Sequence, residues 1–506
     1  MPIDPNAPLS LADARQLLRR AGFGGTPTTI NNLLLRTATR GAAADGMLRF
    51  PARNLKPIGA DMTKVRHSWI RTMFFTAYPL RDKLVLFWHD HFATSAVKVT
   101  NPKLMYTQIG LLYLYYKGNF KDFVKAINKD PAMIEFLDTQ NNNKQEPNEN
   151  YARELQELFT LGVKDLNGNN NYAQEDVAQI ARAFTGWRRN LTTVKAEFHP
   201  SSHDFMANFP SRGPKVIYKN NPAFGAGGAA YAANAGEEGP QEIDTVIDKI
   251  FLHQDSDGKN TVARYIANKL FTYLCHSQPT IPVIDEIIAF SSFDTFFDIG
   301  ALVKGIICHD EFYATEAAPA PYTATTKKSV KWPVDYVMST LRLLGVRPYA
   351  VDFAIRGGSY ADVVDHMDAM GQLLLEPPSV FGWDWETSWV SSTTLLARCT
   401  FARDVVAARD RNVYGFRPEL IKISLSPKVF LIDLTDPTDI LTNAAKYLGI
   451  DDQLSTDDVA ALVTYLRDDG QGGQYTTLDL HDYNIRNTKL YGLFGILLQS
   501  PAYQIH

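Results

Sequence analysis

The chain has 506 residues, of which 45% are hydrophobic and 21% are charged, with a formal net charge of −4. These proportions exclude an intrinsically disordered chain, which combines low hydrophobicity with high net charge. General nucleic-acid binding is also disfavoured, because it rests on clustered lysine and arginine and no basic run occurs. Three cysteines are too few for a disulfide scaffold, and no Cys-x-x-Cys pair indicates structural zinc.

No stretch approaches the roughly 18 consecutive apolar residues of a membrane-spanning helix. The first residues contain no apolar segment of the kind found in signal peptides. We therefore expect no membrane span and either a cytoplasmic location or, for a mature exported chain, a periplasmic or extracellular one.

Apolar residues recur at helical spacing in most of the chain, so the predicted fold class is mainly α, a multi-helix globular protein with minor β. A Ser-x-x-Asp capping box at 455–458 predicts a further helix start. Period-2 runs are few, and residues 429–434 and 216–218 are the best strand candidates. Helices are predicted over residues 11–20, from 79 onward, 151–161, 176–184, 262–274 and 334–344.

A Pro/Thr-rich linker at residues 316–332 predicts a boundary between a large helical domain, 1–315, and a C-terminal helical region, 333–506. A weak repeat is also visible, in which an amphipathic helix is followed by a short turn and an apolar residue. Duplicated helical units would produce this pattern, and so would the ordinary make-up of helical cores. Its three copies begin at Phe120, Ile299 and Leu490.

The segment Phe87–Ser95 carries His89 and His91 two residues apart. On one helix their side chains would point about 200° from each other, so they converge only where the helix ends or the chain is extended. Thr94 and Ser95 favour such an end. The pair is interpreted as metal ligands, with a histidine that caps or hydrogen-bonds the core as the alternative.

The segment Pro147–Gly162 places Asn150, Arg153, Glu154 and Glu157 on one helix face. Glu154 and Glu157 could form an acid/base pair or a ligand pair, with Arg153 holding one of them ionised. The alternative is a solvated face with ordinary ion pairs.

Two further segments carry polar and aromatic side chains. His203 and Asp204 lie in an irregular region after Trp187, and Lys215 follows as a partner for an anion or for Asp204. The segment 377–398 interleaves tryptophans with carboxylates, a composition that suits stacking on sugar rings; the alternative is that the rings pin a long loop onto the core. Those tryptophans are Trp383, Trp385 and Trp389.

Several common motifs are absent. No Gly-x-Gly-x-x-Gly and no Walker A sequence occurs, which gives no support for nucleotide binding. Neither Gly-x-Ser-x-Gly nor His-Glu-x-x-His is present.

Together these segments resemble the bacterial family catalogued as domain of unknown function 1800, nearly from end to end. The resemblance implies a largely helical, often exported protein with no established activity, frequently encoded beside a family similar to sulfatases and phosphatases. Its pattern includes the histidine, asparagine, arginine and glutamate positions named above, with Asn148 and Thr185–Trp187. It is carried by LLRRAGFGGTP (17–27), PLRDKLVLFWHDHFATS (79–95), PNENYARELQELFTLG (147–162), YAQEDVAQIARAFTGW (172–187), ARYIANKLFTY (263–273) and PPSVFGWDWETSWVSSTTLLAR (377–398).

The first hypothesis is an enzyme with a hydrolytic or oxidative site that acts on a carbohydrate-type or other polar substrate. Its catalytic residues would be Asn150, Arg153, Glu154 and Glu157, and a divalent metal such as Zn²⁺, Mn²⁺ or Fe²⁺ would be held by His89, His91, His203 and Asp204. Substrate would contact Trp187, Lys215, Trp383, Trp385 and Trp389. The second hypothesis is a non-catalytic helical binding or structural protein whose buried polar network fixes helix packing.

Overall fold

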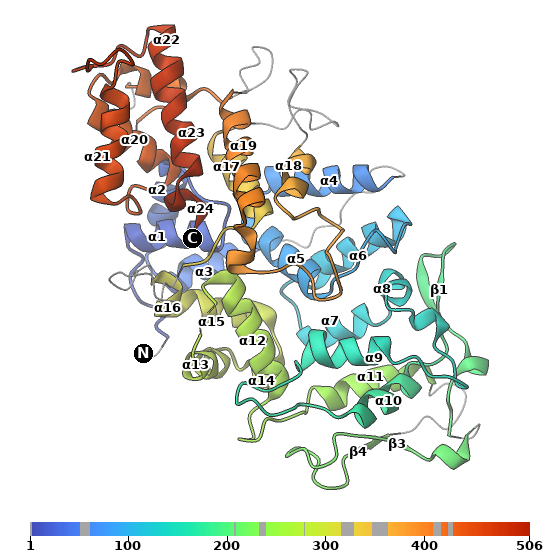
Figure 1. Ribbon diagram of the computed structural model, residues 1–506. Helices are drawn as coiled ribbons and strands as arrows, with labels where there is room; N and C mark the ends of the chain where they lie inside the picture. The colour runs from blue at the N-terminus through green and yellow to red at the C-terminus, as the bar shows by residue number, and fades with distance from the viewer. Residues whose placement is uncertain are drawn as a thin grey trace.

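The computed structural model describes residues 3–50, 61–206, 209–231, 239–277, 279–314, 328–346, 363–407, 416–423 and 429–506. Helices dominate this part of the chain, which confirms the predicted mainly α class (Figure 1). Its strands form two antiparallel pairs: β1 (Trp187–Asn190) with β2 (Lys195–Phe198), and β3 (Lys215–Ile217) with β4 (Ala229–Tyr231). No described helix has the length and apolarity needed to span a membrane.

The helices of the first half of the chain carry the motifs singled out in the sequence. They are α1 (Leu11–Arg20), α2 (Pro27–Arg36), α3 (Arg40–Leu48), α4 (Met62–Phe75), α5 (Pro79–His91), α6 (Pro102–Tyr115), α7 (Phe120–Ile127), α8 (Pro131–Phe136), α9 (Asn150–Glu154), α10 (Gln174–Ala183), α11 (Gly239–Ile250) and α12 (Thr261–Leu274).

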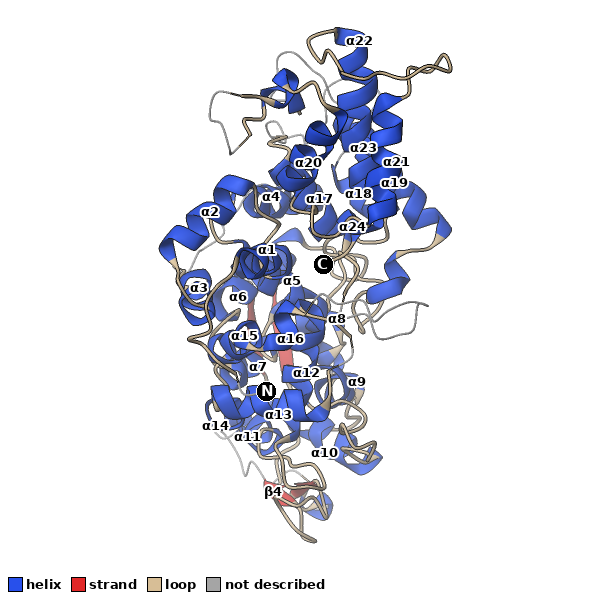
Figure 2. Cartoon of the chain, turned by 90° about the vertical axis from the view of Figure 1, so that its left-hand side faces the viewer, coloured by secondary structure: helices blue, strands red, loops and turns tan. Residues whose placement is uncertain are grey.

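The second half is also helical. Its elements are α13 (Ile281–Ser291), α14 (Phe293–Phe296), α15 (Ile299–Cys308), α16 (Asp310–Tyr313), α17 (Pro333–Leu343), α18 (Val363–Ala369), α19 (Ser392–Ala407), α20 (Pro437–Leu448), α21 (Thr456–Arg467), α22 (Tyr483–Ile485), α23 (Tyr491–Gln499) and α24 (Pro501–Gln504). Figure 2 shows an elongated molecule with α20–α23 at one end and β4 at the other.

Local signals account for many helix starts. The Ser455 side chain accepts a hydrogen bond from the Asp458 backbone N–H, and the Asp458 carboxylate accepts one from the Ser455 backbone N–H. The predicted capping box is therefore present at α21. Ser10 and Asp13 form the same device at α1. Each predicted helix is present, with ends that lie within a few residues of the expected ones.

One predicted strand is wrong. Within residues 429–434, Leu431–Asp433 forms a single 3₁₀ turn, and Phe430 makes only an isolated bridge to Lys422. The Asp433 carboxylate accepts the Phe430 N–H at 3.1 Å and closes this turn locally. The other predicted strand is confirmed as β3 for residues 216–217, and it ends before Tyr218, where φ is +57°. The β1–β2 hairpin was not predicted.

The three repeat copies adopt the same local form. In each, a helix is followed at once by a short one, as α7–α8, α15–α16 and α23–α24. In the first two copies the residue before the long helix, Asn119 or Asp298, caps its first turn. These two caps also form an antiparallel bridge with each other, so the starts of the first two copies lie side by side.

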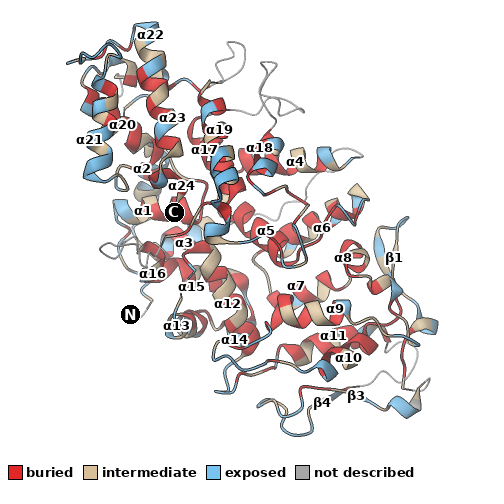
Figure 3. Cartoon of the chain, in the orientation of Figure 1, coloured by how far each residue is buried: buried red, intermediate tan, exposed pale blue. Residues whose placement is uncertain are grey.

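Buried residues follow the whole length of the molecule (Figure 3). Helix α5 is covered nearly all round, since every residue from Leu80 to His91 is buried. Ion pairs join chain segments on either side of the predicted linker, for example Arg19 with Asp452 at 2.9 Å. Most of that linker, residues 316–327, lies outside the described residues, and the two-domain division stays a prediction.

Candidate functional site

His89 and His91 do not converge, because α5 continues through both residues. His89 Nε2 accepts a hydrogen bond from the Leu375 backbone at 3.2 Å, and His91 Nε2 lies 3.1 Å from the Phe159 carbonyl oxygen. Burial lowers the pKa of His89 to about 3 and that of His91 well below its usual value. Both imidazoles are therefore neutral core groups with protein partners.

The carboxyl group between these histidines, Asp90, is a buried polar group to which the sequence analysis assigned no role. Asp90 is buried and accepts the Trp383 backbone N–H at 2.7 Å and the Trp385 indole N–H at 3.1 Å. Burial raises its pKa to about 7, against the opposing charge of Lys269. Gly382, with φ of +84°, packs directly on Asp90. The sequence did contain a clue to Asp90, since a carboxylate stands between the two histidines of the His-x-His pattern.

The tryptophan-rich segment is held against the core by its hydrogen bonds to Asp90. Trp383 and Trp389 are each only 4% exposed and form an apolar cluster with Trp332. Only Trp385 is half-buried, with its ring 6.2 Å from that of Tyr273. Trp383 and Trp389 thus offer no free ring face to a sugar. Of the three tryptophans predicted to stack on sugar rings, Trp385 alone is placed to meet a ligand.

His203 and Asp204 belong to a different part of the molecule. His203 Nδ1 lies 2.8 Å from the Thr185 carbonyl oxygen, and its Nε2 lies 3.0 Å from Glu242. Asp204 Oδ2 accepts hydrogen bonds from two arginines, Arg182 Nε at 2.9 Å and Arg212 Nη1 at 3.0 Å. The described residues contain no group of three or more His, Cys, Asp or Glu side chains able to hold a metal ion. The four predicted ligands are therefore not brought together.

Lys215 completes this buried network. Its ammonium donates to both oxygens of Glu242, at 2.7 and 2.8 Å, and to the Asp204 carbonyl oxygen at 2.8 Å. Burial lowers the pKa of Lys215, and the Glu242 charge opposes that effect. Glu242, on α11, was not identified from the sequence. Lys215 does contact Asp204, as predicted, but its ammonium meets the backbone carbonyl oxygen of Asp204 and not the carboxylate.

The predicted carboxylate face lies on α9 and on a π-helical turn, Leu155–Thr160, that follows without a break. Asn150 is exposed at its start. Arg153 donates to Glu149 at 3.2 Å and to Gln174 at 2.9 Å, so its direct partners differ from the predicted ones. Single π-helical turns occur frequently at functional sites.

Glu154 and Glu157 are both half-buried. Burial raises the pKa of Glu154 to about 7, the negative charge of Glu157 adds to the rise, and Arg153 opposes it. Glu157 accepts a hydrogen bond from the Tyr172 hydroxyl at 3.0 Å. Two carboxyl groups in one place thus have unequal environments, which is the arrangement found in acid/base catalysis.

One face of α12 connects this pair with Trp385. We call Tyr265, Lys269 and Tyr273 the α12 face, because they recur at every fourth residue and are all half-buried. The Tyr265 hydroxyl donates to the Leu158 carbonyl oxygen at 2.9 Å, beside Glu157. Lys269 Nζ lies 5.6 Å from the Tyr265 ring centre. The sequence signal was the segment 263–273, which carried the family resemblance without any assigned role.

Trp187 lies apart from these groups. Its indole is 6% exposed and lines an open groove of about 710 Å³ between α6, α8 and the β1–β2 hairpin. Lys129 Nζ lies 6.0 Å from the Trp187 ring centre and pairs with Asp244 at 2.9 Å. Trp187 and the carboxylate pair are therefore not parts of one cavity wall.

The family described as protein of unknown function (DUF1800) matches residues 16–505, and the chain belongs to that family. No curated protein and no solved structure matches the chain.

Proposed function

We propose that this member of a family of unknown function is a hydrolytic enzyme whose proton-transferring group is Glu154. The observation that carries the proposal is the half-buried Glu154–Glu157 pair, in which the pKa of Glu154 is raised to about 7. A general acid or base acts best when its pKa lies near the working pH. Glu154 is also accessible from solvent, as a group that meets a substrate must be.

The two carboxyl groups would have separate roles. Glu157 accepts a hydrogen bond from the Tyr172 hydroxyl, and its negative charge is one cause of the raised pKa of Glu154. It would stabilise positive charge or orient a water molecule, while Glu154 donates a proton to the leaving group. This division follows the general rule that two carboxyl groups in different environments take the separate roles of acid and base. No metal enters the proposal, because the predicted ligands lie in separate networks.

The α12 face supports a carbohydrate-type substrate. Tyr265, Tyr273 and the neighbouring Trp385 are half-buried rings in a row that starts at the carboxylates. Such rings combine an apolar face with a polar edge. Pairs of carboxyl groups hydrolyse glycosidic bonds by acid/base chemistry. A sugar chain lying along α12 would place one linkage beside Glu154.

A titration tests the acid without knowledge of the substrate. The infrared band of protonated carboxyl groups is followed with pH in the wild type and in Glu154→Gln, and the difference isolates Glu154. We expect one proton to titrate near pH 7 in that difference, and at lower pH when Glu157→Gln is the background, because a like charge is removed. Titration of Glu154 near pH 4.5, its ordinary value, would remove the basis of the proposal.

Activity is tested by release of reducing ends from a panel of polysaccharides. Glu154→Gln should lower any activity found by about 10²–10⁴-fold, the usual contribution of acid–base catalysis. Glu149→Gln is the matched control, since Glu149 is a half-buried glutamate of the same segment that pairs with Arg153. Equal activity in all three proteins would overturn the assignment of Glu154.

The structural alternative is supported by one observation, at a different place. In the network of Arg182, His203, Asp204, Lys215 and Glu242, each side chain has charged or hydrogen-bonded protein partners. We propose that this network fixes the packing of α10, α11 and β3 and takes no part in chemistry.

A further inference from the structure

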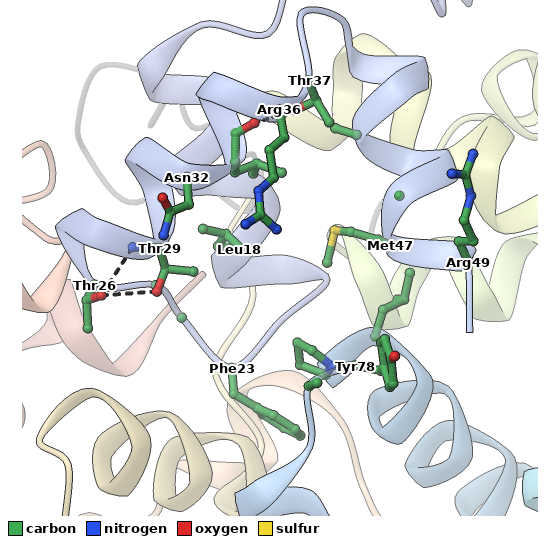
Figure 4. A pocket seen from close by; sticks show the side chains of 18 of the residues that line it. Leu18, Phe23, Thr26, Thr29, Asn32, Arg36, Thr37, Met47, Arg49 and Tyr78 are labelled. Atoms are coloured by element: carbon green, nitrogen blue, oxygen red, sulfur yellow. Dashed lines mark hydrogen bonds between the residues drawn. The ribbon is translucent and has the colours of Figure 1, made fainter. Parts of the chain in front are cut away.

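A cavity of about 830 Å³ opens between α1, α2, α3 and the start of α5 (Figure 4). Sites for small molecules have volumes of about 300–1,000 Å³. The cavity includes the turn at Phe23–Thr26, part of a family motif for which the proposed function has no role. None of its lining residues belongs to the carboxylate pair or to the α12 face.

Most of the wall is apolar. Leu18 and Phe23 come from α1 and the turn after it, Met47 from α3, and Tyr78 from the start of α5. In Figure 4, Phe23 and Tyr78 lie across the cavity from α2. An apolar surface of this kind recognises the hydrocarbon part of a ligand, because binding removes both from water.

The α2 side of the wall is polar and carries hydrogen-bond donors. Thr29, Asn32 and Arg36 recur at helical spacing on α2, and Figure 4 shows them on the same side of the cavity. Among the described residues Arg36 has no ion-pair partner, and its guanidinium points into the space between Leu18 and Met47 in that view.

Other charges on the wall leave Arg36 uncompensated. The one acidic lining residue, Asp45, is paired with Lys304 at 2.8 Å. Arg342 is engaged by backbone carbonyl oxygens at the end of α4, among them Thr76 at 3.0 Å. Arg49 adds a further positive charge at the cavity. The net field therefore favours an anion.

We propose that this cavity binds an amphipathic carboxylate, a fatty-acid-like molecule whose acid group meets Arg36 and whose hydrocarbon body lies against Phe23, Met47 and Tyr78. A guanidinium and a carboxylate form strong charge-assisted hydrogen bonds. Asn32 and Thr29 supply further donors along α2. This site is independent of the proposed hydrolytic function.

Gly46 gives a way to close the cavity without harm to the fold. It lines the cavity within α3, and a Cβ placed there meets no atom within 4 Å. Its backbone is not in the left-handed region, so a larger residue can adopt it. Because glycine is a poor helix former, Gly46→Leu should keep or raise the melting temperature while it fills space at the cavity.

The test is isothermal titration of the full chain with octanoate and with 1-octanol. Octanoate should bind saturably at one site, and Arg36→Gln should weaken it about tenfold or more while leaving octanol affinity unchanged. Gly46→Leu should abolish octanoate binding. Arg71→Gln is the matched control, an exposed arginine on α4 outside the cavity, and it should change nothing.

Two results would overturn the proposal. The first is the absence of saturable octanoate binding to the wild type. The second is octanoate affinity that is the same in wild type, Arg36→Gln and Gly46→Leu, since the ligand would then bind elsewhere. A melting temperature at or above that of the wild type shows that each variant is folded.

Discussion

Removal of the Lys215 ammonium tests whether the buried network stabilises the fold. The Lys215 and Glu242 side chains are each only 2% exposed, so the carboxylate left by Lys215→Met cannot reach water. Breaking a buried pair in this way costs about 3–5 kcal/mol. With an unfolding entropy of about 2.1 cal/mol/K per residue, the 506 residues give about 1 kcal/mol/K. We expect the melting temperature to fall by about 3–5 °C.

Differential scanning calorimetry measures this shift, with Lys129→Met as the matched control. Lys129 also pairs with an acid, Asp244, but both side chains are 34% exposed. Exposed pairs contribute about 0–1 kcal/mol, so the control should fall by about 1 °C or less. The double variant Lys215→Met/Glu242→Leu should lose less stability than the two single variants lose together, because both single changes remove the same interaction. Equal, small shifts in Lys215→Met and Lys129→Met would refute the reasoning.

Three further variants test other parts of the fold by denaturant unfolding. Gly382→Ala should cost at least about 1–3 kcal/mol, because φ is +84° and the new Cβ would lie 2.7 Å from the Asp90 carbonyl oxygen; wild-type stability would contradict this. Burial raises the pKa of Asp90 from 3.8 to about 7. The stabilisation from its protonated form is therefore complete below pH 3.8, and it is lost as the pH rises to about 7. Asp90→Asn should therefore gain about 4 kcal/mol relative to wild type across that window, and a pH-independent difference would refute it. Ser455→Ala should lower the free energy of unfolding by about 1 kcal/mol, because the α21 cap is lost. An unchanged free energy of unfolding would show that this cap does not stabilise the helix.

The helices could be predicted because their signals are local. Helical spacing and capping residues such as Ser455 act within a few positions of one another. The strand expected at 429–434 fails for the opposite reason, since a strand needs a partner. Only Phe430 finds one, at Lys422, and Asp433 closes a turn instead.

The site could be predicted only in part, because burial and pairing are long-range properties. Glu154 and Glu157 were identified from helical spacing alone. Nothing near Asp90 in the chain shows that Trp383 and Trp385, almost 300 residues later, donate to it. Likewise Glu242 becomes important only because the fold brings it to Lys215. Composition gave no means to tell a buried tryptophan from an exposed one.

Burial raises the pKa of three carboxyl groups, Asp90, Asp130 and Glu154, to about 7, yet only Glu154 is half-buried and suits the proposed proton transfer, since Asp90 and Asp130 are buried. Both oxygens of Asp90 already accept hydrogen bonds from the tryptophan-rich segment, and its side chain is sealed from solvent. A change of charge there would act on stability. Glu154 is half-buried, and the charge of the neighbouring Glu157 adds to the rise of its pKa. The raised pKa of Asp90 is therefore a consequence of packing, whereas that of Glu154 supports the proton transfer that we propose.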